Sequence, residues 1–136
     1  VSVKEKISPA SNKKLYQVEF EIRSSPKILY NYISTDNGLA DWFADHVVER
    51  EGKFLFSWDD GEAMEAQLIG NKEFKSVRFK WAKDKEDTYF EFDIVQDDLT
   101  SDVALVISDF ATDKEKAENI LLWDSQVHVL REVLGC

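Results

Sequence analysis

Aromatic side chains recur at every second position in several short segments of this chain, and they offer its clearest binding chemistry. Phe54, Phe56 and Trp58 form one such set, and Phe79 and Trp81 form another. Residues two apart in a β-strand point to the same face of a sheet, so these rings should gather on one side. An apolar surface with a few polar groups is typical of sites for hydrophobic small molecules. Rings can equally fill a dense core, and a filled core is the more frequent outcome.

The candidate cavity residues are those that strand alternation, or the helical spacing of the last segment, turns toward a common interior. Met64 is included because a thioether adapts to irregular surroundings, although it also suits a plain core. Asp109 follows Ile107 on the same strand face, where it would place a carboxylate at the mouth of a cavity or at the end of a loop. The full set is Phe20, Phe56, Trp58, Met64, Phe79, Trp81, Phe92, Leu105, Asp109, Trp123 and Val127.

Side chains suited to catalysis are sparse. His46 follows Asp41 and Asp45, and a carboxylate–histidine contact could serve proton transfer. No nucleophile stands at a recognisable spacing from His46, so an Asp-rich segment ahead of a strand explains this group more simply. Cyclisation or hydrolysis of a bound ligand by Asp109, His46 or a cavity tyrosine remains an alternative, and no catalytic residue is assigned.

The sequence contains no recognisable motif for a metal or a cofactor, and neither is expected. Two histidines and one cysteine, Cys136, are too few for a zinc site of the usual kind. Asp59-Asp60 and Asp97-Asp98 lack the spaced oxygen ligands of a calcium loop and fit solvated turns. Gly-rich phosphate loops and nucleophile elbows are also missing.

The charge of the chain limits its partners. Twenty-seven acidic against seventeen basic residues give a formal net charge of -10, which disfavours nucleic acid and anionic membrane surfaces. No apolar run approaches the length of a membrane span, and the first residues lack a signal-peptide core. The lone cysteine excludes a disulfide framework, so we expect a reducing, cytoplasmic location. For the oligomeric state, we expect a monomer or a homodimer.

The first half of the chain predicts one strand and two short helices, followed by further strands. Residues 16–22 alternate apolar and polar side chains, as in a half-buried strand. Ser24-Ser25-Pro26 supplies a hydroxyl cap and a proline suited to the first turn of a helix. Asp36 and Asn37 can cap a second helix that holds Leu39, Trp42 and Phe43. Six more alternating segments then run from His46 to Ile107, separated by turns such as Asp59-Asp60-Gly61.

The last segment predicts a long helix over residues 112–134. Its apolar residues are spaced three and four apart, which places them on one helical face. Thr112 and Glu115 form a capping box, and Gly135 stands where a helix ends. Such a helix would be roughly 33 Å long, enough to cross a small domain. The residues of its apolar face are Ile120, Trp123, Val127, Leu130 and Leu134.

These segments together predict an α+β fold in which a curved antiparallel sheet wraps around the long C-terminal helix. The order of elements is one strand, two short helices, six strands and the helix. The length of 136 residues suits one domain, which we expect at residues 15–136 after a loose lead-in at residues 1–14.

The order of these segments resembles the helix-grip fold of the START-like superfamily, also called SRPBCC, over about residues 15–134. Within it, Leu39-Ala40-Asp41-Trp42-Phe43 is similar to the Leu-x-x-Trp-aromatic signature of the branch related to activators of the heat-shock chaperone ATPase. Other segments resemble the strands and terminal helix of that branch. They are Gly52-Lys53-Phe54, Val77-Arg78-Phe79-Lys80-Trp81, Phe90-Glu91-Phe92, Val103-Ala104-Leu105 and the helix around Trp123.

The resemblance implies a fold and a short list of functions. Members of the superfamily often bind hydrophobic small molecules between the sheet and the long helix, others assist a protein partner, and a few act on bound ligands. We therefore expect a non-enzymatic protein that binds a hydrophobic small molecule. A co-chaperone-like protein-interaction module is the first alternative, and a cyclase or hydrolase is the second.

Overall fold

The computed structural model describes residues 12–136, and its helices and strands follow in the predicted order. Most of the expected lead-in therefore lies outside the described residues, and the first strand begins at Lys14. The elements are β1 (Lys14–Glu21), α1 (Pro26–Ser34), α2 (Asp36–Ala40), β2 (His46–Arg50), β3 (Lys53–Ser57), β4 (Ala63–Lys72), β5 (Ser76–Trp81), β6 (Phe90–Gln96), β7 (Val103–Ala111) and α3 (Lys116–Leu134).

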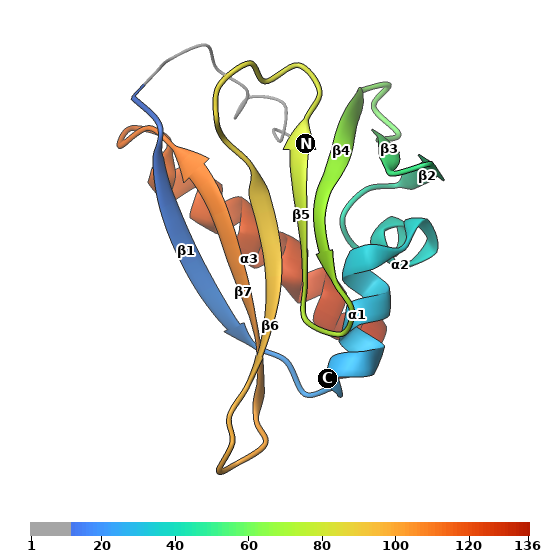
Figure 1. Cartoon of the computed structure of the whole chain (residues 1–136), viewed down its shortest axis with the longest axis vertical. Coiled ribbons are helices and arrows are strands. Elements are labelled where there is room, and N and C mark those ends of the chain that lie inside the picture. The colour runs from blue at the N-terminus through green and yellow to red at the C-terminus, as the bar shows by residue number, and fades with distance from the viewer. Residues whose placement is uncertain (1–11) are drawn as a thin grey trace.

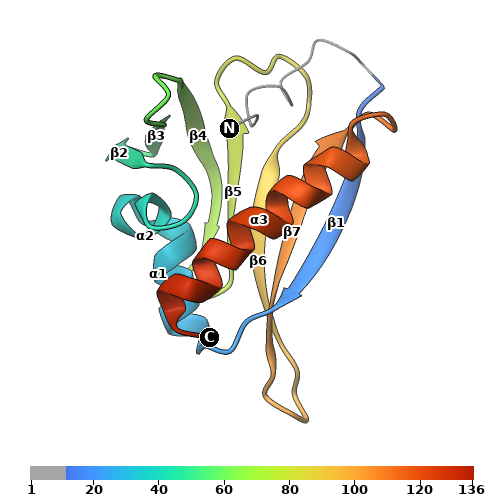
Figure 2. The same cartoon turned by 180° about the vertical axis from the view of Figure 1, so that it is seen from behind.

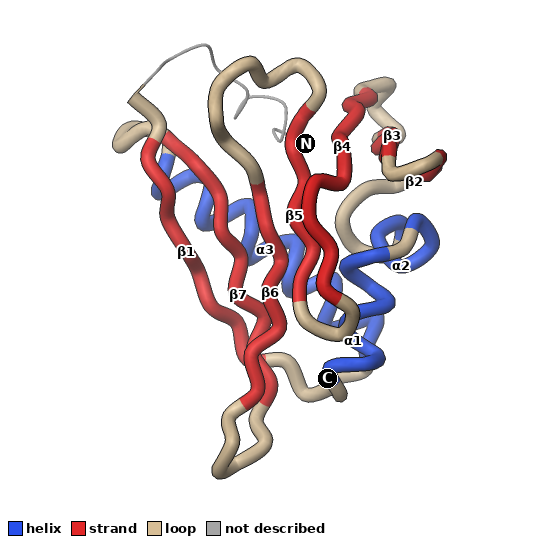
Figure 3. The backbone as a smooth tube through the Cα atoms, in the orientation of Figure 1, coloured by secondary structure: helices blue, strands red, loops and turns tan. Residues whose placement is uncertain are grey.

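All the strands form one antiparallel sheet, and α3 lies across one of its faces. The sheet has seven strands in the order β1-β7-β6-β5-β4-β3-β2 (Figure 1). Seen from behind, α3 runs diagonally from the end near β1 to the side where α1 and α2 lie (Figure 2). The tube drawing shows the same two layers, with helix on one side and strands on the other (Figure 3). The predicted α+β helix-grip arrangement is confirmed.

The two short helices begin as their sequences direct, with one correction. The Ser25 hydroxyl accepts a hydrogen bond from Ile28 N at 3.2 Å, which caps α1 ahead of Pro26. The cap of α2 is Thr35, whose Oγ1 accepts from Gly38 N at 3.0 Å, rather than Asp36 or Asn37. Thr35 is the N-cap because its backbone is extended, whereas Asp36 already lies inside the helix.

The second helix also ends earlier than predicted, at Ala40. Trp42 and Phe43 consequently lie in the turn that follows α2, outside the helix. Gly38 lets α2 approach α1 closely, because a Cβ at that position would stand 2.2 Å from the carbonyl oxygen of Asn31.

The long helix starts four residues later than predicted. The capping-box contacts form as expected: Glu115 N donates to Thr112 Oγ1, and Thr112 N donates to Glu115 Oε1, both at 3.2 Å. They close a turn ahead of the helix, so regular α3 begins at Lys116 and spans about 29 Å. Its end at Gly135, which has a φ of 79°, is confirmed.

Two strands are longer than the sequence pattern predicted. β4 continues through Gly70-Asn71 to Lys72, with a register irregularity between Leu68 and Gly70 in place of a break. β7 runs on to Ala111, so that Asp109 pairs with Tyr16 of β1. Asp109 therefore lies within a strand and not at a loop end.

Candidate functional site

The space between the sheet and α3 is centred on the ring of Phe43. Phe43 stands in the segment between α2 and β2 and is 1% exposed. Its ring centroid lies 4.9 Å from that of Phe56 on β3, 5.8 Å from that of Phe90 on β6 and 6.0 Å from that of Trp123 on α3. One loop-borne ring thus contacts both layers of the fold.

The candidate cavity residues converge on this interior, as the alternation predicted. Ten of the eleven are buried, and Met64 is half-buried against the same core. Sheet rings close the space around Phe43: Phe56 and Phe79 are 6.2 Å apart, and Phe79 and Phe90 are 5.2 Å apart. Aromatic side chains occupy the centre of the interior, which is the filled alternative from the sequence. Whether these residues bind a ligand remains a prediction.

Phe43 was not among the cavity residues expected from the sequence. The sequence pattern placed Phe43 on the second helix, as part of the Leu39–Phe43 signature, and so assigned it to helix packing. The early end of α2 at Ala40 is what turns its ring into the centre of the domain. A signal was available in the two adjacent aromatic residues, Trp42 and Phe43, because a short helix cannot direct both toward one side.

A polar cluster lies inside this aromatic interior, beneath the N-terminal part of α3. Asp109 Oδ2 accepts hydrogen bonds from Trp123 Nε1 at 3.0 Å and from Tyr16 OH at 3.2 Å. Asp109 is 6% exposed, Tyr16 6% and Trp123 2%. Burial, together with the neighbouring Asp109 carboxylate, raises the pKa of the Tyr16 hydroxyl well above its ordinary value. The neutral Tyr16 hydroxyl therefore acts as a hydrogen-bond donor to the carboxylate.

Asn119 adds an unusual feature to the same cluster. It lies one turn before Trp123 on α3 and is 5% exposed. Its Nδ2 makes no hydrogen bond of good geometry among the described residues, although the Asn119 side chain lies close enough to the Tyr16 hydroxyl to act as a weak donor to it. Because a buried donor with a poorly formed hydrogen bond costs free energy, this amide contributes little to the stability of the interior.

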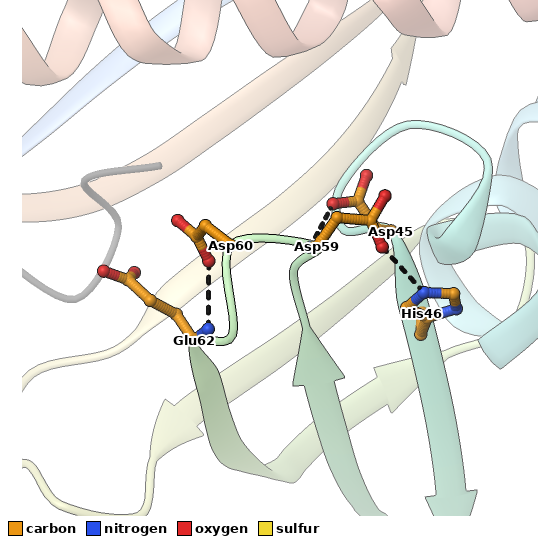
Figure 4. A network of polar contacts seen from close by, with 5 residues as sticks. All are labelled: Asp45, His46, Asp59, Asp60 and Glu62. Carbon is orange, nitrogen blue, oxygen red and sulfur yellow. Dashed lines mark hydrogen bonds and ion pairs between the residues drawn. The ribbon is translucent and has the colours of Figure 1, made fainter.

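The histidine considered for proton transfer lies at the surface. His46 Nε2 is 3.0 Å from Asp59 Oδ1, with 69% and 79% of the two side chains exposed. Asp45 contacts Asp59 instead, since its Oδ2 accepts from Asp59 N at 2.8 Å (Figure 4). His46 therefore contacts the β3–β4 turn rather than Asp45, which agrees with the simpler interpretation of this Asp-rich segment.

That turn forms a network of its own, separate from the aromatic interior. Asp60 Oδ1 accepts from Glu62 N at 2.9 Å, and Gly61 has a φ of 92° (Figure 4). The positive φ of Gly61 fits the predicted Asp-Gly hairpin signal. Within residues 12–136, no group of three or more His, Cys, Asp or Glu side chains could hold a metal ion.

A hollow of about 220 Å³ opens beside Phe43, between the α2–β2 segment and α3. Its wall combines apolar groups with polar ones from both elements. Gln126 of α3 donates to the carbonyl oxygen of Phe43 at 3.4 Å, which ties the segment to the helix. The lining residues are Ala40, Asp41, Trp42, Phe43, Ala44, Asp45, Trp58, Gln126 and Val129.

This architecture, a seven-stranded antiparallel sheet holding one long helix over an aromatic interior, agrees with the family comparisons. The model of the START-like superfamily domain matches residues 10–136. The chain belongs to the START-like superfamily. The resemblance noted in the sequence is thereby confirmed, and the match spans all of the described residues.

Solved structures support this assignment. The START-like chain is 35% identical to BfR322 from Bacteroides fragilis, with 90% of this chain and 92% of that chain covered and a TM-score of 0.66. It is similar in fold to the Aha1 dimer from Colwellia psychrerythraea, at 16% identity, 89% and 96% coverage and a TM-score of 0.73. DynU16, from the dynemicin biosynthetic locus, gives 14% identity, 89% and 47% coverage and a TM-score of 0.76.

The last two likenesses show the fold alone, because their sequence identities are low. A search of curated proteins found no match. Among the described residues, no helix is both long and apolar enough to cross a membrane.

Proposed function

We propose that this START-like domain is a non-enzymatic binding protein for a small hydrophobic molecule. The ligand binds between the sheet and α3, at the position that the Phe43 ring fills in the free protein. The observation that carries the proposal is the location of Phe43, which stands on a loop yet lies at the centre of the aromatic interior. A loop can change its backbone angles at lower cost than a paired strand, so the Phe43 ring should leave its position more readily than the strand-borne rings, once the hydrogen bonds from Phe43 N to the Leu39 carbonyl and from Gln126 to the Phe43 carbonyl open.

The hollow beside Phe43 gives the ligand a way in. It borders the ring on the side of α3 and measures about 220 Å³. For comparison, an apolar cavity of about 150 Å³ is enough to bind benzene. Displacing the Phe43 ring into the hollow would leave an aromatic-walled space for a molecule of one or two rings. The candidate residues Phe56, Phe92 and Trp123 would then contact the ligand.

The proposal gives Asp109 a structural task. Its Oδ2 accepts from two buried donors, Tyr16 and Trp123, and so fixes the indole against which the ligand would lie. A general acid or base must reach the reacting group of its substrate. The cyclase or hydrolase alternative therefore needs Asp109 to exchange these partners for substrate, and nothing in the cluster favours that exchange.

Native mass spectrometry after gentle purification tests the proposal, together with titration by benzene, indole and naphthalene. We expect either a co-purified small molecule or a saturable change in the indole NMR signals of Trp58 and Trp123. A protein that carries nothing and takes up none of these compounds would count against it. We also propose a cytoplasmic location, because the single cysteine, Cys136, is a free thiol, as is usual in a reducing compartment.

A second candidate function, a regulatory module that acts on a protein partner, is favoured by a separate observation. Four carboxylate side chains surround one groove on the outer face of the sheet, and no basic side chain of the described residues lines it.

A further inference from the structure

The outer face of the sheet, opposite α3, has a depression at Ala104. In the strand register, Ala104 of β7 lies between Glu21 of β1 and Val95 of β6. Its neighbours along the strand, Val103 and Leu105, are buried in the core, so Ala104 points to the outer face. A methyl side chain between two longer ones leaves a dip in the surface.

This dip is part of a groove of about 300 Å³ with an apolar floor and an acidic rim. Val95, which is 41% exposed, and Ala104 supply the apolar surface. Neither lysine nor arginine is among the described residues that line it. The rim consists of the carboxylates of Glu19, Glu21, Asp97 and Asp102.

A second outer-face groove shows the contrast. It lies near the β4–β5 turn and also contains carboxylates, but they are matched by bases. Lys75 Nζ is 2.8 Å from Asp93 Oδ1, and Arg78 Nε is 2.8 Å from Glu91 Oε1. The groove at Ala104 therefore concentrates negative charge that is not paired by a basic side chain within its own lining. The bases close to it are Arg23, which lines an adjoining hollow, and Arg131, which donates to the Glu21 carbonyl oxygen at 2.7 Å.

The β6–β7 hairpin extends beyond the body of the sheet (Figure 1), and it carries Asp97 and Asp102 of the rim. Its tip is held in shape by Asp97, whose Oδ1 accepts from Leu99 N at 2.8 Å and from Thr100 N at 2.9 Å. The backbone N–H groups of Thr100 and Leu99 hold the pKa of the Asp97 carboxyl below its ordinary value, so it stays ionised. Leu99, at the tip, is 96% exposed.

We propose that this groove, with the hairpin tip beside it, docks a basic segment of a protein partner. Lysine or arginine side chains of the segment meet the carboxylates of the rim. An apolar side chain of the segment covers Val95 and Ala104, and Leu99 packs against the partner's own surface. Charge complementarity decides for this occupant, because carboxylates around an apolar floor suit a chain that is both cationic and apolar.

The test uses the whole chain and a fluorescently labelled peptide, Lys-Lys-Leu-Lys-Lys, with Lys-Lys-Ser-Lys-Lys as its matched control. Fluorescence anisotropy at low and high salt measures affinity, and backbone amide NMR shifts locate the peptide. We expect the leucine peptide to bind more tightly than the serine peptide, to shift the amides of Val95, Ala104 and Leu99, and to weaken as salt rises.

Two double variants with the same charge change provide the decisive comparison. Glu19→Gln with Glu21→Gln removes two rim charges, and the pair should lower affinity roughly five- to tenfold. Glu73→Gln with Glu118→Gln removes two exposed charges outside the groove and should change affinity far less. All these substitutions are at the surface, so amide spectra should remain those of the folded protein.

Three outcomes would overturn the proposal. The first is no binding of either peptide. The second is that the serine peptide, or the polyamine spermine, binds as tightly as the leucine peptide. This result would mean that the groove attracts cations without recognising a segment. The third is an equal loss of affinity in both double variants, which would mean that net charge alone governs the association.

Discussion

The ring of Phe43 stacks against the indole of Trp123, with ring centroids 6.0 Å apart and ring planes at 21° to each other. Phe43 belongs to the segment between α2 and β2, whereas Trp123 belongs to α3. The contact therefore joins the loop to the helix across the centre of the domain. Trp123 is in turn fixed by Asp109, so one side of the stack is rigid and the other side is carried by a loop.

Removal of the Phe43 ring should create the binding space without any movement of the loop. We expect Phe43→Ala to lower the free energy of unfolding by about 3–5 kcal/mol and to bind benzene or indole more tightly than the unchanged protein. Affinity should rise because no energy is needed to displace the ring. Urea unfolding and thermal shifts with each compound measure both effects.

Phe54→Ala is the matched control for this variant. Phe54 is 2% exposed and contacts Phe56 and Phe79 on the sheet. Phe54→Ala should lower the free energy of unfolding about as much as Phe43→Ala does. It should not bind more tightly the compounds that shift the Trp123 indole signal. If Phe43→Ala does not fold, the same measurements can be made on Phe43→Leu, which removes less of the side chain. Equal ligand affinity in Phe43 variants, Phe54→Ala and the unchanged protein would contradict the location of the site.

The Asp109 carboxylate should be among the most sensitive polar groups of the fold. Asp109→Ala leaves the Tyr16 hydroxyl and the Trp123 indole N–H without this acceptor, so we expect a loss of about 3–5 kcal/mol. Asp109→Asn keeps one acceptor oxygen and should lose about 1–3 kcal/mol. Urea unfolding followed by tryptophan fluorescence compares the two. Unfolding of Asp109→Ala at the same urea concentration as the unchanged protein would refute this role.

Stability should fall at high pH because of Tyr16. The raised pKa keeps this hydroxyl protonated in the folded protein, while it ionises near pH 10 in the unfolded chain. Its contribution is therefore complete below about pH 10 and is lost as the pH rises above that value. We expect the unchanged protein to lose about 1.4 kcal/mol per pH unit more than Tyr16→Phe in this range. Unfolding curves between about pH 9 and 11 measure the difference, and parallel losses would contradict it.

The poorly satisfied amide of Asn119 predicts a stabilising substitution. Asn119→Leu replaces a buried Nδ2, whose only contact with an acceptor is a poorly formed one with the Tyr16 hydroxyl, by an apolar group of similar size. We expect the free energy of unfolding to rise by about 1 kcal/mol. Asn119→Ala should instead lose stability, because it leaves a cavity. If the leucine variant is the less stable of the two, Asn119 has a polar partner that matters.

The order of elements was predictable from the sequence because each element carries its own period. Phe54 and Phe56 repeat every two residues, whereas Trp123 and Val127 repeat every four, and these periods belong to strand and helix. The inward face of each strand follows directly from the same alternation. The aromatic character of the interior was therefore predictable from residue spacing alone.

The position of the site depends on contacts that no local pattern encodes. The helix α2 ends at Ala40, and the turn that follows it brings Phe43 to the centre of the domain. Likewise, Asp109 stays within β7 because β1 pairs with it as far as the Lys14–Ala111 pair. Both positions depend on partners far away along the chain.

The measurement that tests the central claim most directly is the set of nuclear Overhauser contacts between the Phe43 ring and the Trp123 indole, recorded with and without naphthalene. In the free protein the stack should give strong contacts. At saturating naphthalene, they should disappear and be replaced by contacts between naphthalene and Trp123. Contacts between Phe43 and Trp123 that persist at every concentration of naphthalene would contradict the claim that the ligand takes the place of this ring.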